Sequence, residues 1–187
     1  PYLNVFLNRG ILSKAVLSET LEKKENVGTL DAKNEKVLIE FSCPNTNKPL
    51  HLGHCRNNVL GDSIARIYKK AGFDVTKVNL INDRGVHICK SMLAYQKFGD
   101  NCTPESLNKK SDHVVGDFYV KFAIEADKDS NLNKEAQEML IKWEAKDPEV
   151  RALWEKMNDW AIGGIEETYK KMGISFDCVQ RESETYI

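Results

Sequence analysis

Hydrophobic residues occur in short unbroken runs that alternate with helically spaced positions, as in a parallel α/β protein. The run from Val37 to Ser42 predicts a buried parallel strand, and residues 75–82 predict a second one. Between them, residues 53–71 have helical spacing, and Gly72 stands where a helix would end. This strand–helix–strand unit fits a right-handed parallel crossover. The apolar face predicted for its helix comprises Val59, Leu60, Ile64, Ile67, Tyr68 and Ala71.

The pattern differs on either side of this unit. Residues 2–7 predict a short strand, 11–24 a helix and 26–36 a polar linker. Beyond the second strand, helices are predicted over 85–98, 113–126, 134–146 and 148–172, and the chain is expected to return to the sheet over 174–180. Trp143, Trp154 and Trp160 are spaced for packing within the helices. The sequence therefore predicts an α/β core that carries a helical insertion at about residues 103–172.

Composition excludes several classes of protein. Hydrophobic residues make up 41% and charged residues 29%, the balance of a globular protein rather than a disordered one. No apolar run suggests a membrane span, and the first residues lack the pattern of a signal peptide. The five cysteines are widely spaced without a C-x-x-C pair, which argues for a reducing compartment and against a zinc ribbon. We expect a cytoplasmic protein without a membrane partner.

The candidate chemistry lies between the first strand and its helix. Residues 40–54 read Glu-Phe-Ser-Cys-Pro-Asn-Thr-Asn-Lys-Pro-Leu-His-Leu-Gly-His. Ligands of open α/β sheets bind at the carboxyl ends of strands, and helix N-termini attract phosphate. His51 and His54 can donate hydrogen bonds to phosphate oxygens, Lys48 adds positive charge, and Gly53 lets a base or sugar approach the backbone. The sequence therefore predicts a nucleoside triphosphate site without a glycine-rich loop.

Two motifs carry a family resemblance. His51-Leu52-Gly53-His54 resembles the H-I-G-H signature of class I aminoacyl-tRNA synthetases, and the eleven residues before it are similar to those of arginyl-tRNA synthetases. The similarity continues through Arg56-Asn57, Gly61-Asp62 and the segments 82–85 and 115–119. It implies that residues 36–187 form the first half of a catalytic domain with a Rossmann-like nucleotide-binding core. Residues 1–35 would be the end of an N-terminal tRNA-binding domain and its linker.

The resemblance also implies a mechanism and its partners. The arginine carboxylate attacks the α-phosphate of ATP, used with Mg²⁺, and the arginyl group then passes from the adenylate to tRNA(Arg). His51, His54 and Lys48 would be the catalytic residues: the two histidines would stabilise the transition state and Lys48 would hold the phosphates. Gly53 would lie behind the adenosine. No tightly bound metal is expected, and the family is expected to be monomeric. Because the net charge is −1, contacts with tRNA must use a local basic patch or surfaces outside this sequence.

The resemblance assigns the arginine site to residues before and within the signature. Glu40 would accept the guanidinium fork in a bidentate manner, and Asn45 would bind the α-amino end, with His54 nearby. Cys43 stands where serine is commoner in the family and could contact arginine only weakly through its sulfur. The family's second signature loop would lie beyond Ile187, so this piece alone is expected to be inactive.

Three other interpretations remain open from the sequence. His51 and His54 could form a zinc site with His87 and Cys89, since histidines three apart on a helix can share a metal. The chain could be a small H-x-G-H nucleotidyltransferase, although such enzymes place the motif closer to the start of a compact domain. It could also be a non-catalytic tRNA-binding module that has kept the motif.

Overall fold

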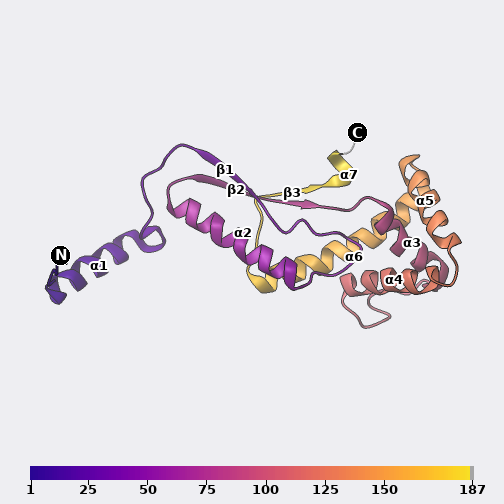
Figure 1. Cartoon of the computed structure of the whole chain (residues 1–187), viewed down its shortest axis with the longest axis horizontal. Coiled ribbons are helices and arrows are strands. Elements are labelled where there is room, and N and C mark those ends of the chain that lie inside the picture. Colours follow the sequence, from indigo (N-terminus) through magenta and orange to yellow (C-terminus); the bar gives the residue numbers. More distant parts are fainter. Residues whose placement is uncertain (186–187) are drawn as a thin grey trace.

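The predicted α/β class with a parallel sheet is confirmed. The computed structural model describes residues 1–185 and contains a three-stranded parallel sheet in the order β1-β2-β3 (Figure 1). Its strands are β1 (Lys36–Glu40), β2 (Asp74–Ile81) and β3 (Cys178–Arg181). Helix α2 (Leu52–Lys70) joins β1 to β2 and packs against both strands, as the predicted crossover requires.

Four helices connect β2 to β3: the first three gather at one end of the sheet, and the long fourth helix runs from there back toward the sheet (Figure 1). They are α3 (Val86–Phe98), α4 (Ser111–Ala126), α5 (Asn131–Glu144) and α6 (Pro148–Met172), and the short α7 (Glu182–Thr185) follows β3. We call α3–α6 the helical layer. Its core is built from Met92, Val115, Ala136 and Met157, among others, and Trp154 and Trp160 pack against it, in agreement with the predicted packing role of the tryptophans. No helix within residues 1–185 is both long and apolar enough to cross a membrane.

The N-terminal segment stands apart from this body. Helix α1 (Arg9–Lys23) and the 3-10 turn η1 (Lys24–Asn26) project away from the sheet, and no residue of α1 is buried (Figure 1). The strand predicted over residues 2–7 was wrong, because residues 1–8 have no regular secondary structure. A strand needs a hydrogen-bonded neighbour, and the described sheet offers none to this segment.

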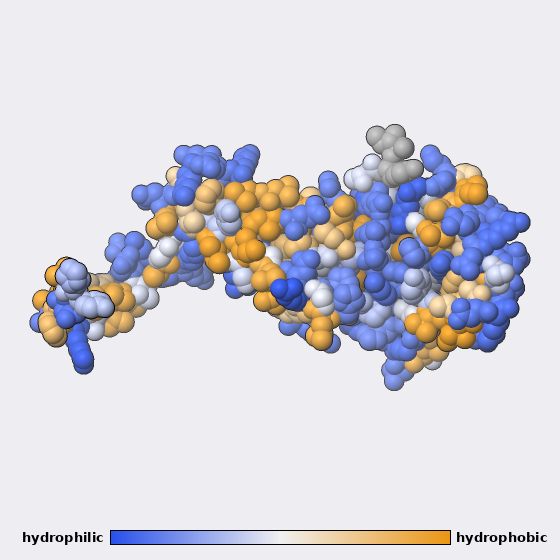
Figure 2. Space-filling model, viewed as in Figure 1, coloured by the Kyte–Doolittle hydropathy of each residue, from blue (hydrophilic) through white to orange (hydrophobic). Residues whose placement is uncertain are grey.

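The apolar face of α2 points away from the sheet. Apolar residues of the predicted face, Val59, Leu60, Ile64, Ile67 and Tyr68, are all exposed, and hydrophobic residues gather on the surface over this helix (Figure 2). The face that meets the sheet instead comprises Asn58, Gly61, Asp62 and Ala65. The pattern identified a face correctly but did not reveal which face packs on the described strands.

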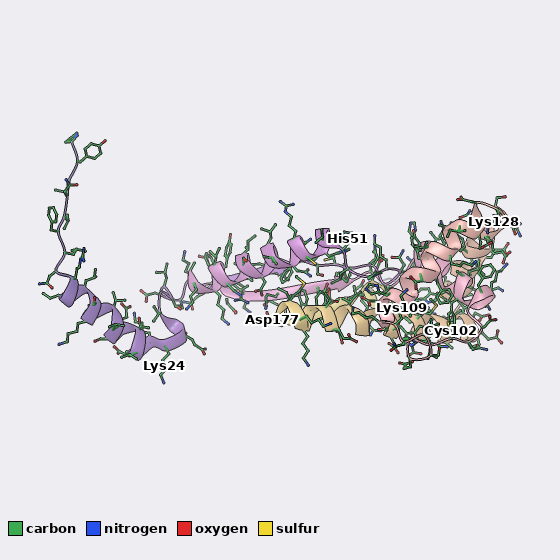
Figure 3. The ribbon with its side chains drawn as sticks, turned by 90° about the horizontal axis from the view of Figure 1, so that it is seen from below. Lys24, His51, Cys102, Lys109, Lys128 and Asp177 are labelled. Carbon is green, nitrogen blue, oxygen red and sulfur yellow. The ribbon has the colours of Figure 1, made fainter. Side chains whose placement is uncertain are left out.

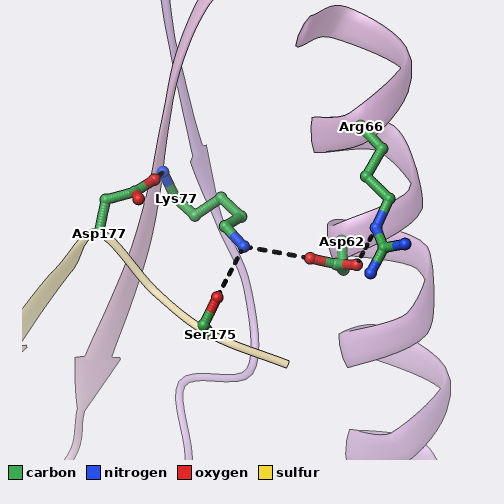
Figure 4. A network of polar contacts seen from close by, with 5 residues as sticks. All are labelled: Asp62, Arg66, Lys77, Ser175 and Asp177. Carbon is green, nitrogen blue, oxygen red and sulfur yellow. Dashed lines mark hydrogen bonds and ion pairs between the residues drawn. The ribbon is translucent and has the colours of Figure 1, made fainter. Parts of the chain in front are cut away.

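Close approach and charge pairing explain this orientation of α2. A Cβ atom on Gly61 would overlap the ring of Phe41, so glycine lets the ring lie against the helix backbone. At the next residue, Asp62 Oδ1 lies 3.2 Å from Lys77 Nζ in β2, and its Oδ2 lies 2.6 Å from Arg66 Nε (Figure 4). The aspartate is buried and paired with two cations, and it fastens α2 to β2.

Lys77 also fixes the chain that returns from α6. Its Nζ lies 3.2 Å from Ser175 Oγ, and its backbone N–H donates to Asp177 Oδ2 at 2.8 Å (Figure 4). Before β3 begins, Ile174 and Phe176 pack with Phe41 and its neighbours in a second apolar cluster. These contacts delay the return to the sheet until Cys178, four residues later than the sequence pattern predicts.

We predict that Gly61→Ala destabilises the chain. The added methyl group collides with the Phe41 ring, and overpacking of this kind costs about 1–3 kcal/mol in free energy of unfolding. Gly163→Ala is the matched control, because a Cβ atom there meets nothing within 4 Å and alanine favours a helix interior by up to about 1 kcal/mol. Urea denaturation of the two variants measures the difference. Equal stabilities would contradict the packing described here.

Candidate active site

The candidate site begins where β1 ends in an unusual turn. Ser42 and Cys43 have φ angles of 75° and 46°, in the left-handed region that residues with side chains rarely enter. Each such residue costs on the order of 1–3 kcal/mol unless its surroundings hold it in place. Here the Ser42 N–H donates to Asn57 Oδ1 at 3.3 Å, and the Cys43 N–H donates to Asn79 Oδ1 at 3.1 Å. Side chains of α2 and β2 thus hold the turn.

A buried tyrosine of α6 completes this support. The Tyr169 hydroxyl lies 2.6 Å from Ser42 Oγ and accepts a hydrogen bond from Asn79 Nδ2 at 3.3 Å. Burial raises the pKa of Tyr169, so the phenol keeps its proton and can serve as a donor. Ser42, Asn79 and Tyr169 are all buried, and together they form one polar network beneath the turn.

The turn brings Glu40 and Cys43 together at the carboxyl end of β1. The Cys43 thiol donates to Glu40 Oε1 at 3.3 Å, while the Glu40 residue itself is exposed. Burial raises the pKa of Cys43, which keeps the thiol protonated as a donor. The sequence predicted only a weak sulfur contact with arginine for Cys43. The structure adds a contact with the carboxylate that was expected to bind the guanidinium.

Asn45 extends the sheet past the end of β1. It forms an isolated parallel bridge with Asn82, which directly follows β2. The Asn82 N–H donates to Pro44 O at 2.9 Å, and the Thr46 N–H donates to Asn82 O at 3.1 Å. The side chain expected to bind the amino end of arginine therefore stands on hydrogen-bonded backbone, at the sheet edge where ligands of α/β proteins bind.

The two histidines cap the first turn of α2 reciprocally. His51 Nδ1 accepts from the Gly53 N–H at 3.1 Å, and His54 Nδ1 accepts from the His51 N–H at 3.2 Å. Their ring centroids are 4.0 Å apart. Because both Nδ1 atoms act as acceptors, a neutral ring carries its proton on Nε2. Each imidazole can therefore offer an Nε2–H donor to a ligand beside the helix N-terminus.

The environment of His54 favours the uncharged ring. Burial lowers its pKa, and repulsion from Lys48 and from the His51 ring when that ring is protonated lowers it further. A protonated Nδ1 could no longer accept the His51 N–H, so the neutral form also preserves the cap. At neutral pH the side chain is thus a directional donor rather than a fixed charge.

Gly53 leaves room for the His51 ring. A Cβ atom on this glycine would lie 2.8 Å from His51 Cε1 and 3.0 Å from its Nδ1, closer than real Cβ contacts allow. The sequence suggested that the glycine lets adenosine approach the backbone. The structure gives a second reason for it, since any side chain would displace a capping histidine.

The helical layer supports the loop that carries Lys48. Gly116 of α4 lies under Pro49, and a Cβ atom there would come within 2.7 Å of Pro49 Cδ and 3.7 Å of Lys48 Cα. This contact places α4 directly against the loop before the signature. His51 lies at the end of α2 nearest the helical layer (Figure 3). Lys48, His51 and His54 therefore come from one continuous segment that packs against α4 and caps α2.

The structure does not assemble the alternative zinc site. His87 Nδ1 lies 3.1 Å from the Tyr119 hydroxyl, and Cys89 is buried with its pKa raised to about 11. Within residues 1–185, no three side chains among His, Cys, Asp and Glu are placed to share a metal ion.

Sequence reasoning named Asn57 only as part of the family similarity, without a role, and missed Asn79 and Tyr169. Asn79 was detectable in principle, because an amide inside an apolar strand requires buried partners. No local pattern marked Tyr169, which meets Ser42 across 127 residues of sequence.

Comparisons with known proteins identify one family. The family model described as tRNA synthetases class I (R), catalytic domain, matches residues 16–186. Among curated proteins, the arginine–tRNA ligase of Treponema denticola is 58% identical and that of Borrelia hermsii 52% identical, each over the whole of this chain. The chain spans only 32% of each of these relatives.

Solved structures show the same relationship. The arginyl-tRNA synthetase of Thermus thermophilus superposes with a TM-score of 0.69 at 28% identity, over 91% of this chain and 27% of that protein. The synthetase of Plasmodium falciparum gives a TM-score of 0.59 at 25% identity, over 81% of this chain and 25% of that protein. With a family model that matches nearly its whole length, the chain belongs to the family of class I (R) tRNA synthetase catalytic domains.

Proposed function

We propose that this chain is part of an arginine–tRNA ligase and supplies its ATP-binding signature and part of its arginine site. The observation that carries the proposal is the reciprocal His51–His54 cap beside a strand end that presents Glu40 and Asn45. The relatives are named arginine–tRNA ligases, which supports arginine as the amino acid and tRNA(Arg) as its acceptor. Activation and transfer would require the whole parent protein.

On the ATP side, the site acts by positioning and by stabilising charge. The histidines can direct Nε2–H groups at phosphate oxygens, and the N-terminus of α2 adds its dipole. Lys48 contributes a positive charge from the adjoining loop. Mg²⁺ would enter with ATP and shield the phosphates. Charge that develops at the α-phosphate is thereby stabilised without a protein nucleophile.

On the arginine side, Glu40 accepts the guanidinium and Asn45 binds the α-amino group. The Cys43 thiol occupies one lone pair of Glu40 Oε1 and so restrains the rotation of the carboxylate. A planar fork of donors matches a carboxylate better than a lysine ammonium does, which favours arginine over lysine.

The organisation of the chain follows from the same proposal. Residues 36–187 would form the first half of the catalytic domain, and residues 1–35 would lead into it from an N-terminal tRNA-binding domain. The exposed α1 is consistent with such a role. We further propose that the parent is a cytoplasmic monomer and that this chain alone is inactive.

The direct test is amino-acid-dependent ATP–pyrophosphate exchange by the full-length parent, with and without tRNA. We expect exchange with arginine and none with lysine, glutamine or glutamate. Exchange with a different amino acid would reject the role of Glu40, and exchange without any amino acid would indicate a nucleotidyltransferase. A folded parent inactive under every condition would point to a binding module.

We predict that Glu40→Gln in the parent raises the KM for arginine. A charge-assisted hydrogen bond contributes about 1.5–3 kcal/mol, which corresponds to an increase of about 10- to 100-fold. Glu35→Gln is the charge-matched control, since Glu35 immediately precedes β1 at its opposite end. An unchanged KM for arginine in Glu40→Gln would remove this carboxylate from the site.

We predict that Gly53→Ala lowers the exchange rate while the protein remains folded. The methyl group displaces the His51 ring from its cap, and misplaced catalytic groups of this kind slow reactions by about 10- to 100-fold. Circular dichroism reports folding, and the exchange assay reports rate. Wild-type exchange by this variant would mean that the His51 position is unimportant.

A further inference from the structure

Asp83 is a buried residue at which several chain segments meet. Its side chain is inaccessible to solvent, and both carboxylate oxygens accept hydrogen bonds from Ser183, one from the backbone N–H at 2.9 Å and one from the hydroxyl at 2.7 Å. Its backbone carbonyl accepts from Trp154 Nε1 at 2.7 Å. Asp83 thus joins the segment after β2 to α6 and to the start of α7.

The same segment supports Asn45. Asn82 precedes Asp83 and carries both backbone hydrogen bonds that hold residues 44–46 in register. The side-chain amides of Asn45 and Asn82 also lie 2.8 Å apart. Asp83 is joined to Asn82 by a single peptide bond. A displacement of Asp83 therefore also moves Asn82, which holds the backbone of Asn45 in register.

The helical layer contacts this segment through an aromatic pair and an ion pair. The Trp154 ring lies edge-on to Trp143 of α5, with centroids 5.3 Å apart. Arg84, next to Asp83, forms an ion pair with Glu144 of α5. Residues 82–84 are consequently attached to α5 and α6 as well as to the sheet, although they contribute none of the proposed ligand contacts.

We propose that Asp83 is a positioning residue for Asn45 and that the Trp154 indole couples the helical layer to the amino-acid end of the site. The proposal rests on the proposed function for the identity of the bound amino acid. The hydrogen-bonded path from Trp154 through Asp83 and Asn82 to residues 44–46 stands independently of it. A shift of α6 would thus alter arginine binding without a direct contact, and the ATP-binding histidines would keep their own cap.

The test compares Trp154→Phe with Trp160→Phe in the full-length parent. Phenylalanine keeps an aromatic ring at position 154 but removes the N–H donor to Asp83. Trp160 lies on the same helix and packs edge-on against Tyr95. We expect Trp154→Phe to raise the KM for arginine about fivefold, the effect of losing one neutral hydrogen bond, with the KM for ATP unchanged. Trp160→Phe should change neither constant.

Hydrogen exchange followed by mass spectrometry gives a second readout that does not need activity. We expect peptides that cover residues 43–47 to exchange about fivefold faster in Trp154→Phe, because the Thr46 N–H bond to Asn82 loosens. Unchanged exchange there, or an equal rise in both KM values, would overturn the proposal. Faster exchange in a parent that shows no arginine-dependent activity would uphold the coupling and reject the proposed function instead.

Discussion

Two consecutive left-handed residues, Ser42 and Cys43, turn the chain out of β1, and the geometry of the site depends on them. An ordinary extended backbone would carry residues 42–45 straight on from the strand. The turn instead returns the Cys43 thiol to Glu40 and leaves Asn45 in register with Asn82. A backbone that is costly locally persists because asparagines from α2 and β2 accept its N–H groups and a tyrosine from α6 holds the Ser42 side chain.

Helices of the helical layer contact the segments that form the site. Gly116 lets α4 touch Pro49 and so supports the loop that leads to the signature. Tyr169 reaches the turn from α6, and Trp154 reaches the segment after β2 from the same helix. The helices between β2 and β3 thus take part in the architecture of the sheet's carboxyl edge.

Local pattern predicted the parts of this structure that depend on local physics. The α2 crossover, the helices after β2 and the position of the histidines at a helix start follow from periodicity, Pro148 and the spacing of the signature. The turn at Ser42 and the Tyr169 network did not follow, because their partners are distant in sequence. The outward direction of the apolar face of α2 was not predicted, because it depends on two tertiary contacts that periodicity does not show. These are the close approach of Gly61 to Phe41 and the ion pair of Asp62 with Lys77. The strand at residues 2–7 failed for lack of a pairing partner among the described strands.

The apolar stripe on α2 has a practical consequence for work with this chain. Contiguous apolar surface of this kind promotes association between molecules, and partly assembled folds that expose it are ligands for chaperones. Self-association should therefore limit the concentration at which the isolated chain stays soluble, even at temperatures at which it remains folded. Detergent or a charged residue at Ile67 would reduce self-association and leave the His51–His54 cap untouched, since Ile67 lies near the other end of the helix.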